Sequence, residues 1–213
     1  SGARRSPFLP VLCLFAAILF TALGVWQVER RAWKLDLIAR VNARVRAPAV
    51  ALPPARQWPT LTRSRVEYLR VTARGRFVHD RETLVDALTE RGPGYWVVTP
   101  LRTAEGIVLV NRGFVPVDRA DPRTRRAGQS GGVVQVTGLA RLTEPGGRFL
   151  RANVPAQQRW YSRDVAAMAR ARGLGRVAPF FIDADAAPNP GEYPIGGLTV
   201  VTSLAGLRQV RSP

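Results

Sequence analysis

Four side chains close to the N-terminus have the types and the spacing of a binding face: Trp26, Gln27, Arg30 and Trp33. If this segment is helical, Trp26, Arg30 and Trp33 lie on one side, because residues three and four positions apart are neighbours on a helix. A guanidinium flanked by two indole rings can hold a carboxylate of a ligand or of a partner protein. The alternative is ordinary anchoring at a membrane surface, which does not require Gln27.

His79 and Arg112 are two further candidate binding residues. His79 is the single histidine of the chain, and a neutral imidazole can ligate iron. Beside Asp80 and Arg81 it fits equally well in a turn at the end of a strand. Arg112 can contact a partner, although the segment Asn111-Arg112-Gly113 favours a sharp turn out of a sheet.

The acidic residues Asp183, Asp185 and Glu192 come closest to a metal-binding pattern. Their uneven spacing and the intervening Pro188 and Pro190 favour a solvated loop instead. The chain also has only one cysteine and one histidine, which excludes an intrachain disulfide and a multi-histidine metal site within the chain. We therefore expect no metal site.

The sequence lacks the usual signatures of an enzyme and of a nucleic-acid-binding protein. No nucleophile–base pair and no glycine-rich loop between a strand and a helix is visible, so we expect no catalytic residues. The net charge of +17 suggests nucleic acid, but the basic residues are spread along the whole chain, and all but one of the 32 are arginine. We expect this charge to face anionic lipid headgroups or acidic partner surfaces, with no nucleic acid bound.

An uncharged segment from Phe8 to Trp26 follows a short N-terminal tail, residues 1–7. As a helix it would be roughly 28 Å long, about the thickness of a bilayer core. Ala22-Leu23-Gly24 has the form of a signal-peptide cleavage site, which is the alternative interpretation. We favour one retained transmembrane helix over residues 8–26.

The helical pattern continues beyond the apolar segment. Residues 27–47 are expected to form an amphipathic juxtamembrane extension, ended by Ala47-Pro48. Residues 48–64 are rich in proline and are expected to be a linker.

From residue 65 to 202 the pattern predicts one domain of mostly antiparallel strands with one or two helices, an α+β fold after an N-terminal transmembrane helix. Strands are expected at 66–78 with an interruption at Gly75, from Thr83, and over 95–101, 107–111, 133–139, 179–183 and 199–202. Ser162 is expected to cap a helix that contains Met168, a core residue rather than an axial ligand, and that ends at Gly173. Residues 118–132 are expected to form a mobile polar loop and residues 203–213 a C-terminal tail.

Several separated segments together resemble one known family. The motif G-x-W-Q-x-x-R-x-x-W-K is found at Gly24–Lys34, and later segments follow in the family order: Gly75-Arg76-Phe77, Gly94–Leu101, Val110–Pro116, Glu144–Asn153, Trp160 and Asp164–Ala169. This order is similar to that of the Surfeit locus family of cytochrome c oxidase assembly proteins. In Val110–Pro116, Phe114 replaces the tryptophan of the family pattern.

The resemblance implies a role in building haem–copper oxidases, centred on haem insertion into the catalytic subunit. The implied partners are that subunit, other assembly factors or respiratory-complex subunits, and membrane lipid. No tightly bound cofactor is expected. Transient contact with haem, such as haem a, is expected. A haem propionate is one carboxylate that the face at Trp26, Gln27, Arg30 and Trp33 could hold.

The resemblance also implies a bacterial inner-membrane protein with its domain on the periplasmic side. The basic residues that follow the apolar segment would favour the cytoplasmic side, but a large domain can override that rule. Family members have a second membrane helix, some with a histidine at its head, whereas residues 202–213 are too short and too charged to span a membrane. This difference motivates an alternative role as a stable single-span accessory subunit of a respiratory oxidase or supercomplex.

Overall fold

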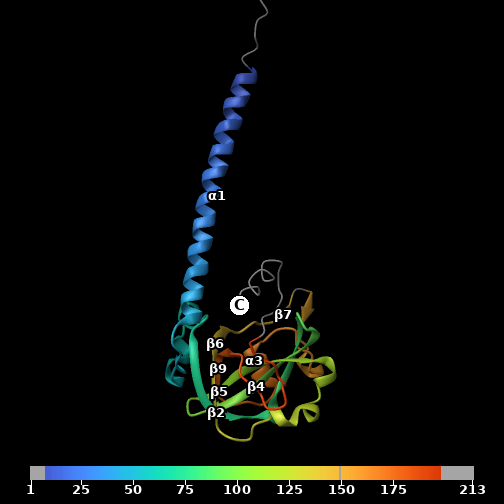
Figure 1. Ribbon diagram of the computed structural model, residues 1–213. Coiled ribbons are helices and arrows are strands. Elements are labelled where there is room, and N and C mark those ends of the chain that lie inside the picture. Colours follow the sequence, from blue (N-terminus) through green and yellow to red (C-terminus); the bar gives the residue numbers. More distant parts are fainter. Residues whose placement is uncertain (1–7, 149, 198–213) are drawn as a thin grey trace, which may run out of the picture. The chain divides into compact units, whose positions relative to one another are not determined.

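The computed structural model describes residues 8–148 and 150–197. The chain divides after Arg46 into a helical unit and a β domain. The expected α+β class is confirmed, with an apolar N-terminal helix followed by mostly strands and a few short helices (Figure 1). The strand expected at 199–202 and the tail 203–213 lie outside the described residues.

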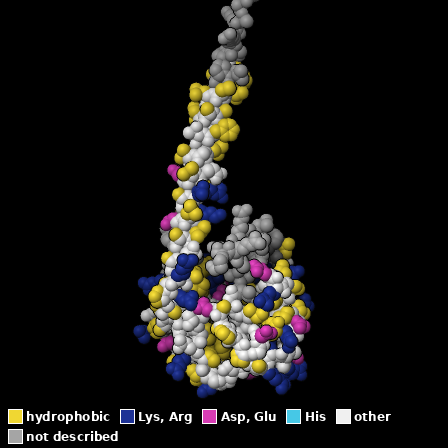
Figure 2. All heavy atoms as spheres, viewed as in Figure 1, with side chains coloured by type: hydrophobic (Ala, Val, Ile, Leu, Met, Phe, Trp, Pro, Cys, Tyr) yellow, Lys and Arg dark blue, Asp and Glu magenta, His cyan; other side chains and the backbone are white. Residues whose placement is uncertain are grey.

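The first unit is a single helix, α1, from Phe8 to Arg46. Its stretch Val11–Asp36 is, among the described residues, the one segment that is long and apolar enough to cross a membrane. Hydrophobic side chains surround its N-terminal half, and Lys and Arg side chains gather toward its C-terminal half (Figure 2). The apolar segment and the juxtamembrane extension therefore form one helix, which ends before Ala47-Pro48 as predicted.

The β domain is built on a seven-stranded sheet in the order β1-β2-β6-β9-β5-β4-β3. The strands are β1 Val50–Ala51, β2 Arg70–Phe77, β3 Thr83–Thr89, β4 Gly92–Thr103, β5 Gly106–Pro116, β6 Val134–Leu142 and β9 Val177–Ala184. A further pairing of β2 with β4 closes β2, β6, β9, β5 and β4 into a small barrel. The sheet is mostly antiparallel, as predicted, but the β1–β2 and β5–β9 pairs are parallel.

The barrel separates two hydrophobic cores, because successive side chains of a strand point to opposite faces. In β9, Ala178, Phe180 and Ile182 belong to the cluster inside the barrel. Phe181 points to the other side and packs in the second cluster with Trp160 and with Met168 of the helix α3, Val165–Ala171. Met168 is thus a core residue, as predicted.

The segment 48–64, expected to be a linker, packs against the barrel instead. It contains β1 and the 3₁₀ helix η1, Ala55–Thr60. Trp58 is 5% exposed in the barrel core, and its indole Nε1 donates to the carbonyl of Pro53 at 2.8 Å. Val66, expected in a strand, belongs to the one-turn helix α2, Arg63–Val66. The prolines therefore shape a covering segment rather than a spacer.

The sharp turn expected at Asn111-Arg112-Gly113 is wrong, because these residues lie within β5. The register with β4 shifts between Trp96 and Val98, opposite this segment. Gly113 has φ +131°, and a Cβ there would lie 2.1 Å from the carbonyl oxygen of Ile195. The glycine thus allows another segment to approach a continuing strand, which sequence alone cannot distinguish from a turn.

Two other expectations are corrected in detail. The polar segment 118–132 contains the 3₁₀ helices η3, Val117–Arg119, and η4, Pro122–Gly128, and a buried ion pair between Arg125 and Glu82. The N-terminal cap of α3 is Asp164 rather than the expected Ser162. The Asp164 carboxylate accepts from the Ala167 N–H at 3.0 Å. The short hairpin β7, Gly147–Arg148, and β8, Arg151–Ala152, precedes that helix.

Candidate functional site

The predicted face of α1 is present on a continuous helix. Trp26, Arg30 and Trp33 occupy positions i, i+4 and i+7 of α1, and Trp26 and Trp33 are 48% and 63% exposed. The Arg30 guanidinium lies over the Trp26 ring, 5.1 Å from its centroid. Stacking with Trp33 is absent from the contacts of the described residues, so the expected sandwich is half formed. Gln27 is exposed beside it.

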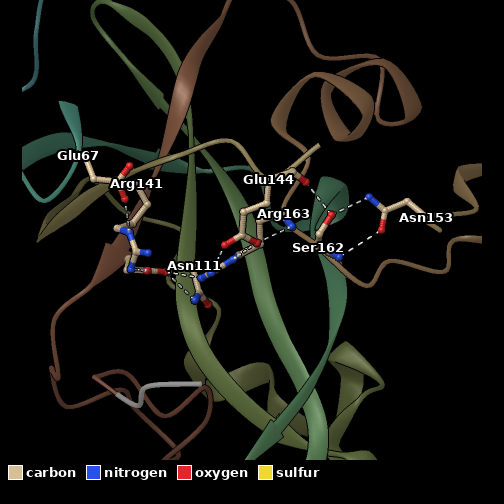
Figure 3. Close-up of polar contacts among 8 residues, drawn as sticks. Glu67, Asn111, Arg141, Glu144, Asn153, Ser162 and Arg163 are labelled. Atoms are coloured by element: carbon tan, nitrogen blue, oxygen red, sulfur yellow. Dashed lines mark hydrogen bonds and ion pairs between the residues drawn. The ribbon is translucent and has the colours of Figure 1, made fainter. Parts of the chain in front are cut away.

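A second polar cluster, which the sequence did not predict, lies in the β domain around Asp183 at the end of β9 (Figure 3). The Asp183 carboxylate accepts from Asn111 Nδ2 at 2.9 Å and from Arg163 Nη1 at 2.9 Å. Arg141 lies 3.4 Å from the other oxygen and reaches Glu67 at 3.4 Å. One carboxylate thus joins β5, β6, β9 and the segment before α3.

Arg163 is the centre of this cluster. Its Nε and Nη2 donate to the two carboxylate oxygens of Glu144 at 3.1 and 2.6 Å, a bidentate pair. Its guanidinium carbon lies 4.5 Å from the centroid of the Phe181 ring. Its Nη1 donates to Asp183, so each of the three guanidinium nitrogens has a carboxylate acceptor.

Asn153 and Ser162 hold the neighbouring loop. The Asn153 side-chain oxygen accepts from the backbone N–H groups of Tyr161 and Ser162 at 2.8 and 3.1 Å. Ser162 Oγ donates to the Glu144 carbonyl at 2.6 Å, and Asn153 Nδ2 lies 3.0 Å from the same Oγ. These bonds fix the chain just before Arg163 and so orient its guanidinium (Figure 3).

The electrostatics agree with a structural cluster. Burial acts to raise the pKa of Glu144, but the hydrogen bonds and charge of Arg163 outweigh it, and the pKa is lowered. Burial acts to lower the pKa of Arg163, but Asp183 and Glu144 outweigh it, and that pKa is raised. Each group is therefore held in its charged form by its partners.

The charged side chains of this cluster pair with one another rather than offering a reactive group. It borders a concavity of about 840 Å³ whose lining includes Trp96, Arg148 and Gly197. The carboxylates of Glu144 and Asp183 are engaged by guanidinium groups, and Asp185 pairs with Arg70. The solvated loop expected for these acids is wrong for Asp183, which lies in β9 and pairs with Arg141 and Arg163. Asp185 and Glu192 do lie beyond the end of β9, where Asp185 pairs with Arg70 and Glu192 is exposed.

The structure brings the other two predicted residues, His79 and Arg112, to one corner of the barrel. The Phe77 ring is shared between them, 5.6 Å from the His79 ring and 4.7 Å from the Arg112 guanidinium carbon. His79 Nε2 lies 2.9 Å from the Ser130 carbonyl, and Arg112 Nη2 donates to the Gly128 carbonyl.

For His79, the predicted role of a haem ligand stays a prediction. Its Nε2 is engaged with Ser130, and its Nδ1 is buried. Burial lowers the pKa of His79 below its ordinary value. An iron atom at Nε2 would have to replace the contact with the Ser130 carbonyl.

Comparison with known proteins decides the family. The sequence pattern of the SURF1 family matches residues 14–207. The chain is 39% identical to Surfeit locus protein 1 of Rattus norvegicus and 38% identical to that of Homo sapiens, over 94% of this chain and 69% and 70% of theirs. It is 37% identical to a SURF1-like protein of Monosiga brevicollis, over 95% of this chain and 80% of that protein.

The chain belongs to the SURF1 family. The predicted resemblance to the Surfeit locus family is confirmed. The structure explains one segment that carried it, Val110–Pro116. In this SURF1 family chain Asn111 donates a hydrogen bond to Asp183, and Arg112 lies at the barrel corner. Gly113 has no side chain and so allows the backbone of Ile195 to approach. Phe114 packs edge-on against Trp96.

Sequence reasoning missed Arg141 and Arg163 as partners of Asp183. It also missed Glu144 as the partner of Arg163, and Asn153, which holds the loop before Arg163. One signal was present: Asp183 follows directly on an apolar strand, and an acid there requires a cationic or hydrogen-bonding partner. Because nearly all of the 32 basic residues are arginine, the sequence could not indicate which arginine supplies it.

Proposed function

We propose that this chain is a membrane-anchored assembly factor for a haem–copper terminal oxidase that assists haem insertion into, or maturation of, the catalytic subunit. The observation that supports it is the family match, which spans residues 14–207 and so covers both α1 and the β domain. The helix is the membrane anchor, and the β domain lies on the extracytoplasmic side of the bacterial inner membrane.

The protein acts by binding rather than by catalysis. The acidic and basic side chains of the Asp183 cluster form ion pairs with one another, and these pairs stabilise the domain. The α1 face, Trp26, Gln27, Arg30 and Trp33, is exposed and available to a partner. A carboxylate of the catalytic subunit, or a propionate of haem in transit, is the ligand chemistry that this face would take.

Lateral packing is the second way in which α1 can associate with the oxidase. Large apolar side chains on α1, from Phe8 to Ile38, are exposed in this chain. In a bilayer such a helix meets either lipid or another helix. This favours, as a second candidate, a stable accessory subunit that stays with the mature oxidase.

Deleting the gene and purifying the oxidase tests the first proposal. We expect the remaining oxidase to contain less haem per catalytic subunit and to be correspondingly less active. Full haem occupancy and activity would contradict it.

Purification of mature, active oxidase in mild detergent separates the two candidates. Recovery of this chain only with immature intermediates supports a transient factor, whereas stoichiometric retention supports the accessory subunit.

A further inference from the structure

A pocket of about 310 Å³ lies at the end of the barrel near Arg112. Its lining includes the apolar side chains of Phe77, Val110, Val134 and Val136, which also belong to or pack on the interior core. The rest of the lining comes from strands and from two loops and includes Arg112, Ser130, Thr137, Asp185 and Ala187. The volume is at the lower end of the range for small-molecule sites.

Arg112 brings an incompletely satisfied cation into this apolar pocket. The residue is 6% exposed. Its Nη2 donates to the Gly128 carbonyl, and its guanidinium stacks on Phe77 at 4.7 Å. Its Nη1 is buried with no hydrogen-bond partner among the described residues. A buried guanidinium N–H without an acceptor is costly, because it has lost water and gained nothing.

The nearby acids do not supply the missing acceptor. Asp185, which also lines the pocket, is paired with Arg70 through both carboxylate oxygens. Glu82, whose charge acts on Arg112, is paired with Arg125. Burial lowers the pKa of Arg112 to about 10, which still leaves it charged near neutral pH. The pocket therefore keeps one positive charge that the described part of the chain does not pair.

We propose that this pocket binds a small molecule with one carboxylate and a compact apolar body. The carboxylate accepts from Nη1 of Arg112, and the body packs on Phe77, Val110 and Val136. Ser130 and Thr137 also line the pocket. This site does not depend on the proposed role in oxidase assembly, and it is separate from the α1 face.

The test uses the full chain in lipid nanodiscs and two fluorinated probes followed by ¹⁹F NMR. 4-Fluorobenzoate carries the charge and the apolar body, and 4-fluorobenzamide has the same shape without the charge. Empty nanodiscs report partition into lipid. We expect saturable binding of the benzoate, with an affinity at least about tenfold above that of the benzamide, and weak competition by acetate.

Three variants locate the binding. Arg112→Leu removes the cation and should erase the preference for benzoate. Arg102→Leu removes the same charge from an exposed position on β4 and should leave binding unchanged. Ala187→Trp fills the pocket from an exposed lining position without altering Arg112 and should weaken both probes. If Arg112→Leu does not fold, the proposal is still tested by the ratio of the benzoate and benzamide affinities of the wild type and by the Ala187→Trp variant.

Three results would overturn the proposal: no saturable binding of 4-fluorobenzoate in the millimolar range, equal affinity for the two probes, or binding that survives Ala187→Trp. None of these measurements involves the oxidase, so their failure is distinct from failure of the assembly role.

Discussion

Arg163 of the β domain and Arg30 of α1 have opposite surroundings. Arg163 is 8% exposed and is satisfied by Glu144, Asp183 and the Phe181 ring. Arg30 lies on an exposed helix face and contacts the Trp26 ring. A buried charge must find its partners within the fold, whereas an exposed one is free to find them elsewhere. The difference separates arginines that hold this protein together from those available to a partner.

Arg112 lies between these extremes. It is as buried as Arg163, yet it has one carbonyl, one ring and an unpaired Nη1 among the described residues. A charged group whose partners all lie within the fold is expected to have a structural role. The free energy of unfolding should therefore depend most on the fully paired ions, little on Arg112 and not at all on Arg30.

The largest loss of stability is expected for Glu82→Gln. The side chains of Arg125 and Glu82 are 1% and 7% exposed, and the neutral amide leaves a buried guanidinium without its counter-ion. Breaking such a pair costs about 3–5 kcal/mol. Denaturant unfolding of the wild type and the variant measures it. The exposed Asp118→Asn, at the Arg119 pair, is the matched control and should change stability by less than about 0.5 kcal/mol.

Arg163→Met comes next, with an expected loss of about 3 kcal/mol. The substitution keeps the packing on Phe181 but leaves Asp183 and Glu144 without their shared cation. The carboxylates are 25% and 38% exposed, so water compensates them in part. A loss below about 1 kcal/mol in the same unfolding assay would refute a structural role for the cluster.

Arg112→Leu should change the free energy of unfolding by less than about 1 kcal/mol in either direction. The variant loses one hydrogen bond and a stacking contact, but it also removes the cost of burying an N–H that has no acceptor. A loss comparable with that of Arg163→Met would show that Arg112 is structural and would remove the contrast.

His79 should give a smaller effect that depends on pH. Because burial lowers its pKa below the ordinary value near 6.5, the unfolded state binds a proton more readily than the folded one. The stability from the neutral ring is complete above about pH 6.5 and is lost as the pH falls through the lowered value. Partial exposure limits the change to about a few tenths of a kcal/mol. His79→Gln should show a weaker acid dependence of unfolding; identical pH profiles would argue against it.

Arg30→Lys is expected to have no measurable effect on stability or on the amount of protein in the membrane. Both side chains can reach lipid headgroups with one positive charge. Quantitative immunoblotting of membrane fractions measures the amount, and lower levels than those of the wild type would indicate a structural role for Arg30.

The sequence was sufficient for the features that depend on local patterns. The apolar segment, its end at Ala47-Pro48 and the short strands separated by turns follow from hydropathy and from Gly and Pro positions. Features that depend on long-range pairing were not predictable. The barrel closure by β2 and β4, the burial of Trp58 and the role of Gly113 all require segments distant in sequence to meet.

The same limit applies to the sites. Trp26, Arg30 and Trp33 were found because helical spacing alone brings them together. The meeting of His79 and Arg112 around Phe77 joins β2, the turn after it and β5, and no spacing rule connects them. The Arg163 cluster likewise depends on the tertiary fold.

Association with the oxidase catalytic subunit is the most direct test of the assembly role. Pull-downs at matched expression compare the wild type with Arg30→Lys, with Gln27→Ala and with Arg31→Lys, a control one position around the helix. If Arg30 holds a carboxylate with its planar fork, lysine cannot reproduce the contact, and recovery should fall roughly ten- to a hundredfold. Gln27→Ala should have a weaker effect and Arg31→Lys none. Equal recovery of the subunit and its haem in all four would contradict the account and leave the face as a membrane anchor.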